Sequence, residues 1–554
     1  MSASSKKKLR KEQETAALTE KQQQEQKESK KLKAYTLTFV IVIALVLIIG
    51  LVTLVSGWIT TSGIVERSTV ALTVGDHDIS SAELNYFYID VINANYSNWY
   101  STYGDYTSFY LSMMGLDLTQ PLNAQAYSTD GTQTWADYFA EQAVDEAVAS
   151  YVLCDLADKA GYELTETDKT SVQTAMDNMQ YYADENNLSL KDYLRSFYGN
   201  GATVDSYRKY LEVVALATSY ELHIYDGRTY EQGTIDAYSE ANFLDFTSFS
   251  YLTFQVNHNE FINQFCTADE TDKEHTHTEE EKSAALKAAA DAANALAEGT
   301  ATDAVTLNKA IKALDVYKDS ESATASESHS VLYTQIANAE IAEWLAEDGR
   351  KAGDKTVIAN TNSTTAEDGT VTSTPYAYTV VLFLERNDNT DKMVNVRHIL
   401  KSFSNDPNAT EFTDEQKANA KEFIENLQES WLKDPTEENF AILAMNNSTD
   451  SGSKANGGLY SNVFRGQMVT NFNNWCFDES RKPGDYGIVE SDFGYHLIYF
   501  VDHCDQTYRD YMIENKLRND DHNAWLEDAI AAAKHTVHDT SKLSLDLILL
   551  RQAV

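Results

Sequence analysis

The chain has 554 residues and a formal net charge of −41 at pH 7, with 43% hydrophobic and 11% aromatic residues. This composition excludes a mainly disordered chain, and a prior of roughly 150 residues per domain predicts three or four folded units. The acidic excess argues against nucleic acid as a partner, because phosphate binding requires a cationic surface.

The first predicted element is a membrane-spanning helix over residues 34–58, a segment without any charged residue. A helix of this length spans roughly 37 Å at about 1.5 Å per residue, enough to cross a hydrocarbon core of about 30 Å. A cleaved signal peptide is the alternative, but its apolar region is typically about 7–15 residues long. We therefore expect a retained signal anchor.

Residues 1–33 form a polar tail with ten Lys or Arg and five Glu. Basic residues beside a membrane helix favour the cytoplasmic side, so we expect the N-terminus to stay in the cytoplasm. The prediction is a single-pass protein of the cell membrane, contacting the bilayer through residues 34–58 and exposing the bulk of its chain outside the cytoplasm.

A helical lobe is predicted over residues 65–245. It opens with a short strand over residues 70–74 and a turn, after which Ser80 and Glu83 have the spacing of a capping box at a helix start. Apolar periodicity predicts further helices over residues 134–159 and around residues 191–194 and 207–211.

Ten aromatic residues fall between Tyr86 and Tyr110 of this lobe. Core packing is the commoner explanation for helical aromatics at this density. The alternative is a surface that holds extended polypeptide segments, since tyrosine combines an apolar ring with a polar tip.

The C-terminal half contains an internal repeat. The segment Trp344-Leu-Ala-Glu-Asp-Gly-Arg-Lys-Ala-Gly-Asp354 aligns without gaps to Trp475-Cys-Phe-Asp-Glu-Ser-Arg-Lys-Pro-Gly-Asp485, with five identical positions. Each copy continues to a β-rich end, residues 378–383 in one and 495–500 in the other. Two related domains in tandem are predicted.

The second copy contains three short sequence motifs: Val394-Asn-Val-Arg-His-Ile-Leu400, Arg465-Gly-Gln-Met468 and Gly494-Tyr-His-Leu-Ile498. They resemble the opening strand, pocket segment and closing strand of parvulin-type peptidyl-prolyl isomerases. The strand and capped helix near residue 70 likewise resemble the start of the N-terminal domain of PrsA- and SurA-type chaperones. No cysteine closely follows residues 34–58, so this chain differs from the many PrsA-type foldases that are lipoproteins.

The resemblance implies roles for individual residues of the second copy. His398 and His496 would be the paired histidines beneath the substrate, with Ser491 linked to them and Asp450 at the family's acid or thiol position. These four are the expected catalytic residues. The expected substrate-binding residues are Met468 and Phe472, as the cup for the proline ring, and Tyr460 at a usual apolar wall position.

Residue chemistry fits prolyl isomerisation better than hydrolysis. The reaction twists an amide whose barrier is about 18–20 kcal/mol, and a dry apolar cup favours the less charge-separated transition state. No Ser or Cys lies in a nucleophile elbow. The segment after His398 has one cation and no arginine cluster, so unmodified prolyl bonds are expected rather than phosphorylated sites. The family commonly has Gly-Gly-Asp-Leu-Gly where this chain has Gly457-Gly-Leu-Tyr-Ser461, which affects turnover or substrate preference.

The first copy, residues 246–387, resembles a degenerate, non-catalytic parvulin-like domain. Its opening strand is expected to place Tyr251 where the second copy has His398, and Thr379 where the second has His496. Two polar insertions, residues 267–282 and 359–374, are expected to be surface loops.

No cofactor and no metal are expected. Cys266, His275 and His277 match no common zinc spacing, and a solvated insertion is the favoured interpretation. Cys476 and Cys504 are the cysteines most able to share a domain, and whether they pair stays open. The tail over residues 504–554 is predicted to be largely helical, with Trp525, Leu526 and Ile530 in a stripe that could pack on the N-terminal lobe.

The sequence thus predicts an α+β multidomain protein with an N-terminal transmembrane helix, a helical chaperone-like lobe and two tandem parvulin-like domains, the second over residues 394–503. The predicted function is isomerisation of X-Pro bonds in unfolded, newly exported polypeptides, together with client binding. Two alternatives are a non-catalytic holdase and a structural envelope scaffold. The oligomeric state is not specified by the sequence.

Overall fold

The computed structural model describes residues 63–549, apart from residues 129, 267–275, 366–369, 407–408 and 410. Over those residues, none of the helices has the length and apolar character needed to cross a membrane. The predicted membrane span and the basic tail before it lie outside the described residues. The described chain forms two compact units: an N-terminal lobe that ends at Thr229 and includes the chain from Lys516 onward, and a sheet unit from Tyr230 to Asn515.

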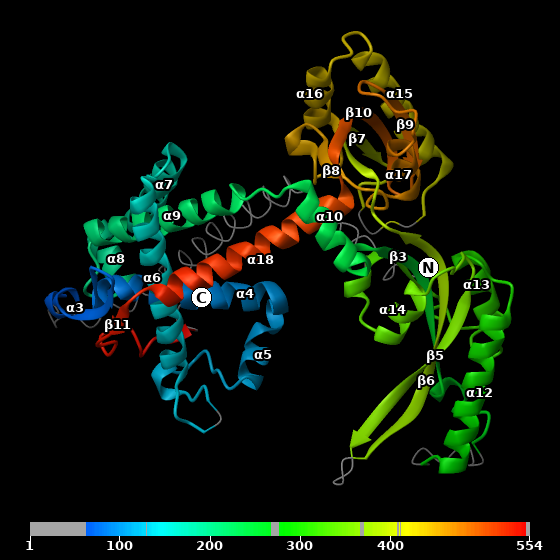
Figure 1. The fold of residues 1–554 in the computed structure, drawn as a ribbon, viewed down its shortest axis with the longest axis horizontal. Helices are drawn as coiled ribbons and strands as arrows, with labels where there is room; N and C mark the ends of the chain where they lie inside the picture. Colours follow the sequence, from blue (N-terminus) through cyan, green and yellow to red (C-terminus); the bar gives the residue numbers. More distant parts are fainter. Residues whose placement is uncertain are drawn as a thin grey trace. The chain divides into compact units, whose positions relative to one another are not determined.

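The N-terminal lobe combines a helical bundle with a small sheet (Figure 1). Its helices are α3 (Ile64–Ser68), α4 (Ser81–Tyr103), α5 (Thr107–Met113), α6 (Trp135–Ala160), α7 (Glu166–Glu185), α8 (Leu190–Tyr198) and α9 (Val204–Asp226), with 3₁₀ turns η1 (Gly104–Tyr106) and η2 (Leu122–Ala124). The predicted capping box is confirmed, since the Ser80 hydroxyl accepts from the Glu83 N–H and the Glu83 carboxylate accepts from the Ser80 N–H.

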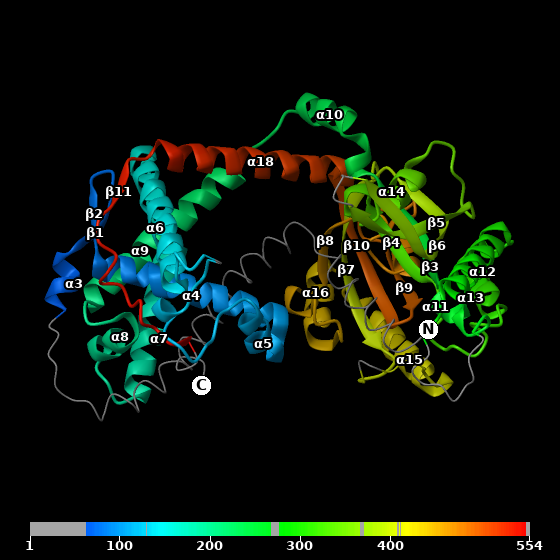
Figure 2. The ribbon, with the colours of Figure 1, turned by 90° about the horizontal axis from the view of Figure 1, so that it is seen from below.

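The C-terminal tail packs on this lobe, which confirms the expectation from its apolar stripe. Helix α18 (Tyr508–Ala532) contributes Trp525 and Leu526 to an apolar cluster that includes Tyr220. The chain then adds β11 (His535–Val537) beside β1 (Val70–Val74) and β2 (His77–Ser80), in the order β11-β1-β2 (Figure 2). A strand of three residues is too short to leave a period in the sequence, and it was not predicted.

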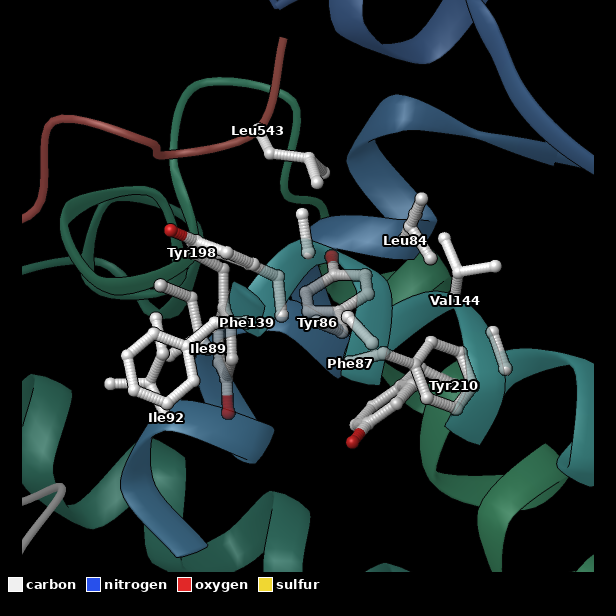
Figure 3. Packing of buried hydrophobic residues seen from close by; sticks show 14 of the residues in the cluster. Leu84, Tyr86, Phe87, Ile89, Ile92, Phe139, Val144, Tyr198, Tyr210 and Leu543 are labelled. Carbon is white, nitrogen blue, oxygen red and sulfur yellow. The ribbon is translucent and has the colours of Figure 1, made fainter. Parts of the chain in front are cut away.

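The aromatic segment of α4 and α5 divides into two parts. Tyr86, Phe87 and Tyr88 are buried in the lobe's main core, where Tyr86 stacks on Tyr210 at 5.2 Å (Figure 3). Further along, beyond the midpoint of α4, large aromatic side chains such as Tyr106 are exposed. Core packing therefore explains the buried rings and also Tyr96 and Trp99, which pack against the same core, but not the exposed rings.

The sheet unit contains two four-stranded antiparallel sheets. The first module comprises α10 (Gln232–Ala241), η3 (Phe243–Phe246), β3 (Ser248–Asn257), α11 (Asn259–Ile262), α12 (Glu279–Glu298), α13 (Ala304–Lys312), β4 (Ser326–Leu332), η4 (Tyr333–Gln335), α14 (Ala339–Ala346), β5 (Lys355–Thr365) and β6 (Val371–Asn387). The second module comprises β7 (Lys392–Ser402), α15 (Asp414–Trp431), α16 (Glu437–Asn447), η5 (Lys454–Asn456), β8 (Leu459–Val463), α17 (Thr470–Cys476), β9 (Tyr486–Ser491) and β10 (Gly494–Thr507).

The two sheets have equivalent strand orders, β4-β3-β6-β5 and β8-β7-β10-β9. Between the first and second strands of the chain lie α11, α12 and α13 in the first module and α15 and α16 in the second, and each module has one short α-helix between its second and third strands. Both sheets bury two faces: in the second module, Val396 and Phe500 face one apolar cluster while Ile399 and Leu497 face another. This alternation is the period of two that a sheet covered on both sides requires.

The repeated sequence has the same geometry in both modules. The guanidinium of Arg350 donates to the Trp344 carbonyl at 2.5 Å, and that of Arg481 donates to the Trp475 carbonyl at 2.9 Å. The glycine two residues before each third strand adopts a positive φ, 91° at Gly353 and 92° at Gly484. A side chain is strained in this region, which explains why both copies use glycine there.

The two predicted surface loops of the first module are partly wrong. Residues 359–365 continue β5 and residues 371–374 begin β6, so the described part of this insertion is a β-hairpin (Figure 1). Its Thr and Ser side chains are polar, yet the ladder satisfies the backbone, and threonine favours strands. In the other insertion, residues 279–282 form the first turn of α12, capped by Thr278.

Candidate functional site

Two histidines lie on neighbouring strands in the centre of the second module. His398 on β7 pairs with Ile498, and His496 on β10 pairs with Leu400, which makes the histidines diagonal neighbours on one face of the sheet. Only 4% of His398 and 5% of His496 is exposed. Phe472 of α17 covers them edge-on, with ring centroids 5.4 Å from His398 and 5.3 Å from His496.

The histidines belong to a continuous hydrogen-bond network. The two Nδ1 atoms are 3.2 Å apart, and His398 Nε2 lies 2.9 Å from Asp450 Oδ2. On the other side, Ser491 Oγ lies 2.7 Å from His496 Nε2. An ionised carboxylate can only accept, so His398 donates through Nε2 to Asp450.

The protonation of His496 follows from its burial. Burial, together with the nearby His398, lowers the pKa of His496 to about 3, although the Asp450 charge acts in the opposite direction. A neutral His496 has one N–H. Ser491 Oγ accepts from the Phe493 N–H at 3.1 Å and also lies 3.4 Å from the Gly494 carbonyl oxygen, a second acceptor for its hydroxyl. A neutral imidazole donates through one ring nitrogen and accepts through the other, so His496 donates in one of its two contacts, with His398 or with Ser491, and accepts in the other.

Asp450 collects the donors of the site. Its Oδ2 accepts from the Tyr460 hydroxyl at 3.0 Å, from the Ser453 N–H at 3.1 Å and from the Ser453 hydroxyl, besides His398. Burial alone would raise the pKa of Asp450, but the hydrogen bonds and the His398 ring lower it well below its ordinary value. The carboxylate is therefore ionised. Its Oδ2 is surrounded by protein donors, and its Oδ1 accepts from the Gly452 N–H at 3.3 Å.

The loop that carries Asp450 is fastened to β7. The Thr449 N–H donates to the Leu400 carbonyl at 2.8 Å, and the Ser448 hydroxyl accepts from the Leu400 N–H at 3.2 Å. On the other side of His398, Gly458 has a φ of 73°, and a Cβ there would lie 2.2 Å from the His398 carbonyl oxygen. Only glycine allows this approach, which explains why residue 458 in the Gly457-Gly-Leu-Tyr-Ser461 stretch is glycine.

The apolar side of the site is built by the pocket segment. Met468 and Tyr460 pack against the cluster that contains Phe472. The turn before Met468 is held by the Gln467 side-chain carbonyl, which accepts from the Phe464 N–H at 3.0 Å. The Gln467 amide nitrogen is buried and has no hydrogen-bond partner among the described residues.

The structure therefore brings together the residues expected from the sequence. His398, His496, Asp450, Ser491, Tyr460 and Phe472 are in mutual contact, and Met468 lies in the same apolar cluster. Sequence analysis missed Ser453, which is fully buried and lies 3.1 Å from His398 Nε2. An Asp followed three residues later by Ser is a turn signature that could have identified it.

The first module has no counterpart of this network at the histidine positions. His398 is paired with Ile498, which lies two residues before Phe500. In the first module, Val381 lies two residues before the equivalent Phe383 and is paired with Thr253. Thr253 is therefore the equivalent of His398. The prediction that Tyr251 takes the place of His398 is therefore wrong by two residues. A shift of two keeps a side chain on the same face of the strand, so the pattern alone could not exclude it.

The second position agrees with the sequence prediction. Thr379 takes the place of His496, and Asn360 takes the place of Ser491. The Asn360 amide donates to the Thr379 hydroxyl at 3.0 Å. The first module thus retains the side-chain hydrogen bond between its third and fourth strands, but without an imidazole.

Metal-binding chemistry finds no support. Across the described ranges, no group of three or more His, Cys, Asp or Glu side chains is arranged to hold an ion. Of Cys266, His275 and His277, His275 lies outside those ranges, and His277 Nδ1 is 3.8 Å from Glu281 Oε2. Cys476 and Cys504 are both free thiols.

The site lies in a segment that matches a known family. Residues 378–503 match the model of the PPIC-type PPIase domain. The match begins within β6 and includes the whole second module.

Solved structures to which the chain is similar include two PrsA proteins. PrsA from Bacillus anthracis, a peptidylprolyl isomerase, is 22% identical over 26% of this chain and 59% of its own, with a TM-score of 0.17. PrsA from Bacillus cereus is 23% identical over 30% of this chain and 58% of its own, with a TM-score of 0.17. The chain thus spans under two thirds of these PrsA proteins.

A third similar structure comes from work on PEB4 and Cj1289, two SurA-like chaperones of Campylobacter jejuni. It is 13% identical over 77% of this chain and 92% of its own, with a TM-score of 0.13. No curated protein matches the chain.

Proposed function

We propose that this chain is a foldase that accelerates cis/trans isomerisation of X-Pro bonds in unfolded polypeptides. The observation that carries the proposal is the network in which His398 and His496 are buried beside Asp450 and covered by Phe472. The match of residues 378–503 to the PPIC-type PPIase domain supports it.

The reaction needs a surface that favours a twisted amide. Resonance gives the planar peptide bond a barrier of about 18–20 kcal/mol, and twisting removes part of the charge separation between oxygen and nitrogen. A dry cup lined by Met468 and Phe472 favours the twisted state over water. Each 1.4 kcal/mol or so of such preference gives about a tenfold rate increase.

The histidines act as a rigid polar floor for this cup. Because each imidazole nitrogen of the network has a protein partner, the two rings are held in one orientation. The Oδ2 of Asp450 is bound by His398, Ser453 and Tyr460, so in this proposal the carboxylate positions His398 and sets the local field.

Hydrolysis is less compatible with the same atoms. The contact between Ser491 and His496 resembles a nucleophile with its base. However, burial keeps the pKa of His496 near 3, so this imidazole is too weak a base to activate a hydroxyl at neutral pH. Isomerisation needs no proton transfer and is the better fit.

The remaining regions have proposed roles that follow from their residues. The first module, with Thr253 and Thr379 in place of histidines, is a non-catalytic parvulin-like scaffold. The N-terminal lobe binds unfolded segments, and residues 34–58 anchor the chain so that its bulk is extracytoplasmic. Membrane sedimentation after an alkaline wash, combined with protease accessibility from outside the cell, tests the anchor and its orientation.

An isomerisation assay on a short proline peptide, with the full chain in detergent, tests the activity. We expect acceleration by the wild type and a loss of about tenfold or more for Met468→Ala, since the cup loses its apolar wall. Asp450→Asn keeps the shape of the side chain but removes its charge, and should also lower activity. No acceleration by the wild type would reject the isomerase and leave the holdase alternative.

The alternatives differ in a second measurement. A holdase suppresses aggregation of several unrelated unfolded proteins without accelerating isomerisation. A scaffold for one fixed partner does neither, so suppression across unrelated clients argues against it.

A further inference from the structure

The end of α4 and the adjacent α5 expose an unusually apolar surface. Its members are large side chains with 42–71% of their area exposed: Tyr100, Tyr106, Phe109, Tyr110, Met113 and Met114. We call these six residues the α5 surface. They lie within fifteen positions of the sequence, and α5 lies at the end of α4 in both ribbon views (Figures 1 and 2).

This exposure is a consequence of how α5 is anchored. Thr107 and Leu111 are buried, so one face of the short helix is fixed to the lobe and its opposite face points outward. The outward rings are also ordered among themselves. Tyr110 stacks on Tyr103 with centroids 4.4 Å apart and meets Phe109 edge-on at 5.6 Å. Contiguous exposed apolar residues of this kind mark interaction sites in soluble domains.

The stretch of chain that carries the α5 surface is rich in acidic residues and contains no basic ones. No Lys or Arg occurs between Arg67 and Lys159, a stretch that contains thirteen Asp or Glu. Two of these acids, Asp105 and Asp117, are exposed and flank the surface in the chain. Such a field attracts positive groups and repels anionic ones.

We propose that the α5 surface binds extended segments of unfolded clients in which Lys or Arg alternate with apolar residues. This inference rests on the proposed function, since it assigns the client class of the N-terminal lobe. Aromatic faces accept both apolar side chains and cations, the latter through cation–π contacts. Methionine adapts its shape to different partners. The acidic field adds attraction for the basic positions and disfavours anionic lipid or a second copy of the same acidic stretch.

Binding of labelled peptides to the full chain, followed by fluorescence anisotropy, tests the proposal. The probes are four peptides of equal length: basic and apolar, acidic and apolar, neutral and apolar, and basic without apolar residues. We expect the basic and apolar peptide to bind about tenfold more tightly than the acidic and apolar one at low ionic strength, and this ratio to fall as salt is added. Equal affinity for these two peptides would overturn the proposal.

A variant pair locates the binding. Phe109→Ser/Met113→Ser changes two side chains that are 62% and 71% exposed and should weaken the basic and apolar peptide about tenfold. The matched control, Val305→Ser/Val371→Ser, changes side chains of the sheet unit that are 79% and 60% exposed and should bind like the wild type. Unchanged binding in the first variant would place the clients elsewhere and reject the α5 surface.

Two further measurements, of isomerase activity and of self-association, separate this inference from the proposed activity. Phe109→Ser/Met113→Ser should retain wild-type isomerisation of a short proline peptide, so a chain without any isomerase activity would reject the proposed function alone. Sedimentation of the wild type and both variants tests whether the α5 surface instead binds a second copy of the chain. If the wild type self-associates, only the α5 variant is monomeric and no peptide binds, the surface is a contact between copies and the proposal fails.

Discussion

The two sheet modules have equivalent strand orders but different residues at the centre of one face. The second module has His398, His496 and Ser491 in one network, and the first has Thr253, Thr379 and Asn360 at the same positions. Both arrangements satisfy a buried polar position between the third and fourth strands. The fold therefore needs a hydrogen bond there but does not need an imidazole, which points to a role for the histidines other than stability.

Exchanging residues between the modules is the strongest way to break this comparison. His398→Thr/His496→Thr gives the second module the side chains of the first, which the equivalent sheet of the first module already accommodates. We expect kcat/KM for a proline peptide to fall about a hundredfold, because the polar floor of the cup is lost. The change is measured in the full chain, with circular dichroism as the check on folding.

The matched control is Thr253→Ala/Thr379→Ala in the first module. It removes two hydroxyls at the equivalent positions and should leave kcat/KM within about twofold of the wild type, since the first module is not catalytic in our proposal. A large loss here would show that the first module takes part in the reaction. Retained activity in the double threonine variant of the second module would remove the histidines from the mechanism.

Acidification should affect the two modules differently. His496 has a pKa of about 3 when folded, against about 6.5 for an unperturbed histidine. The unfolded chain therefore binds a proton that the native chain rejects, so stability is complete above pH 6.5 and is lost as the pH falls. With about 1.4 kcal/mol per pH unit, the second module should lose about 2 kcal/mol between pH 6.5 and 5.

The burial of Cys476 makes this loss measurable in one module. This thiol is fully buried in the second module, so its modification by dithiodipyridine in urea reports local unfolding. His496→Thr should remove most of the pH dependence of the urea midpoint. His503→Thr, which changes an exposed histidine of the same strand, should keep it. The same pH dependence in both variants would contradict the neutral state of His496.

A smaller effect is expected from the partner of His496. Ser491→Ala removes the hydroxyl 2.7 Å from Nε2, which should cost about 1 kcal/mol and lower kcat/KM about fivefold. Asn360→Ala removes the equivalent hydrogen bond to Thr379 in the first module and should leave kcat/KM unchanged. If Asn360→Ala lowered activity as much as Ser491→Ala, the proposal that only the second module is catalytic would be contradicted.

The same pair of modules indicates what sequence could and could not predict. His398 and His496 were found because short motifs carry them, and a strand that alternates its faces brings both to one side. The register of β3 was assigned two residues away, since the β3–β6 ladder has an irregularity between Ser250 and Tyr251 and a shift of two preserves the face. Irregularities of this kind depend on the partner strand and leave little trace in one sequence.

Loop residues were harder to predict for a related reason. Asp450 was expected at the site because of its family position, but Ser453 was missed, since its contact with His398 depends on how the loop folds back on β7. The hairpin of β5 and β6 was expected to be a loop, because its side chains are polar on both faces. Backbone pairing can stabilise such strands without any apolar pattern.

The smallest expected effect concerns Tyr460, which lies in the Gly457-Gly-Leu-Tyr-Ser461 stretch, where parvulin-type domains commonly have Gly-Gly-Asp-Leu-Gly. Its hydroxyl is one of several donors to Asp450, so Tyr460→Phe leaves the carboxylate bonded to His398 and Ser453. We expect kcat/KM to fall only about twofold, the size of one hydrogen bond that is partly replaced. Tyr460→Leu, which also removes the ring 5.1 Å from His398, should change the preference for the residue before proline more than the rate. A loss above about tenfold in Tyr460→Phe would mean that the hydroxyl itself acts on the substrate, and the second module would then differ from the first by a tyrosine as well as by its histidines.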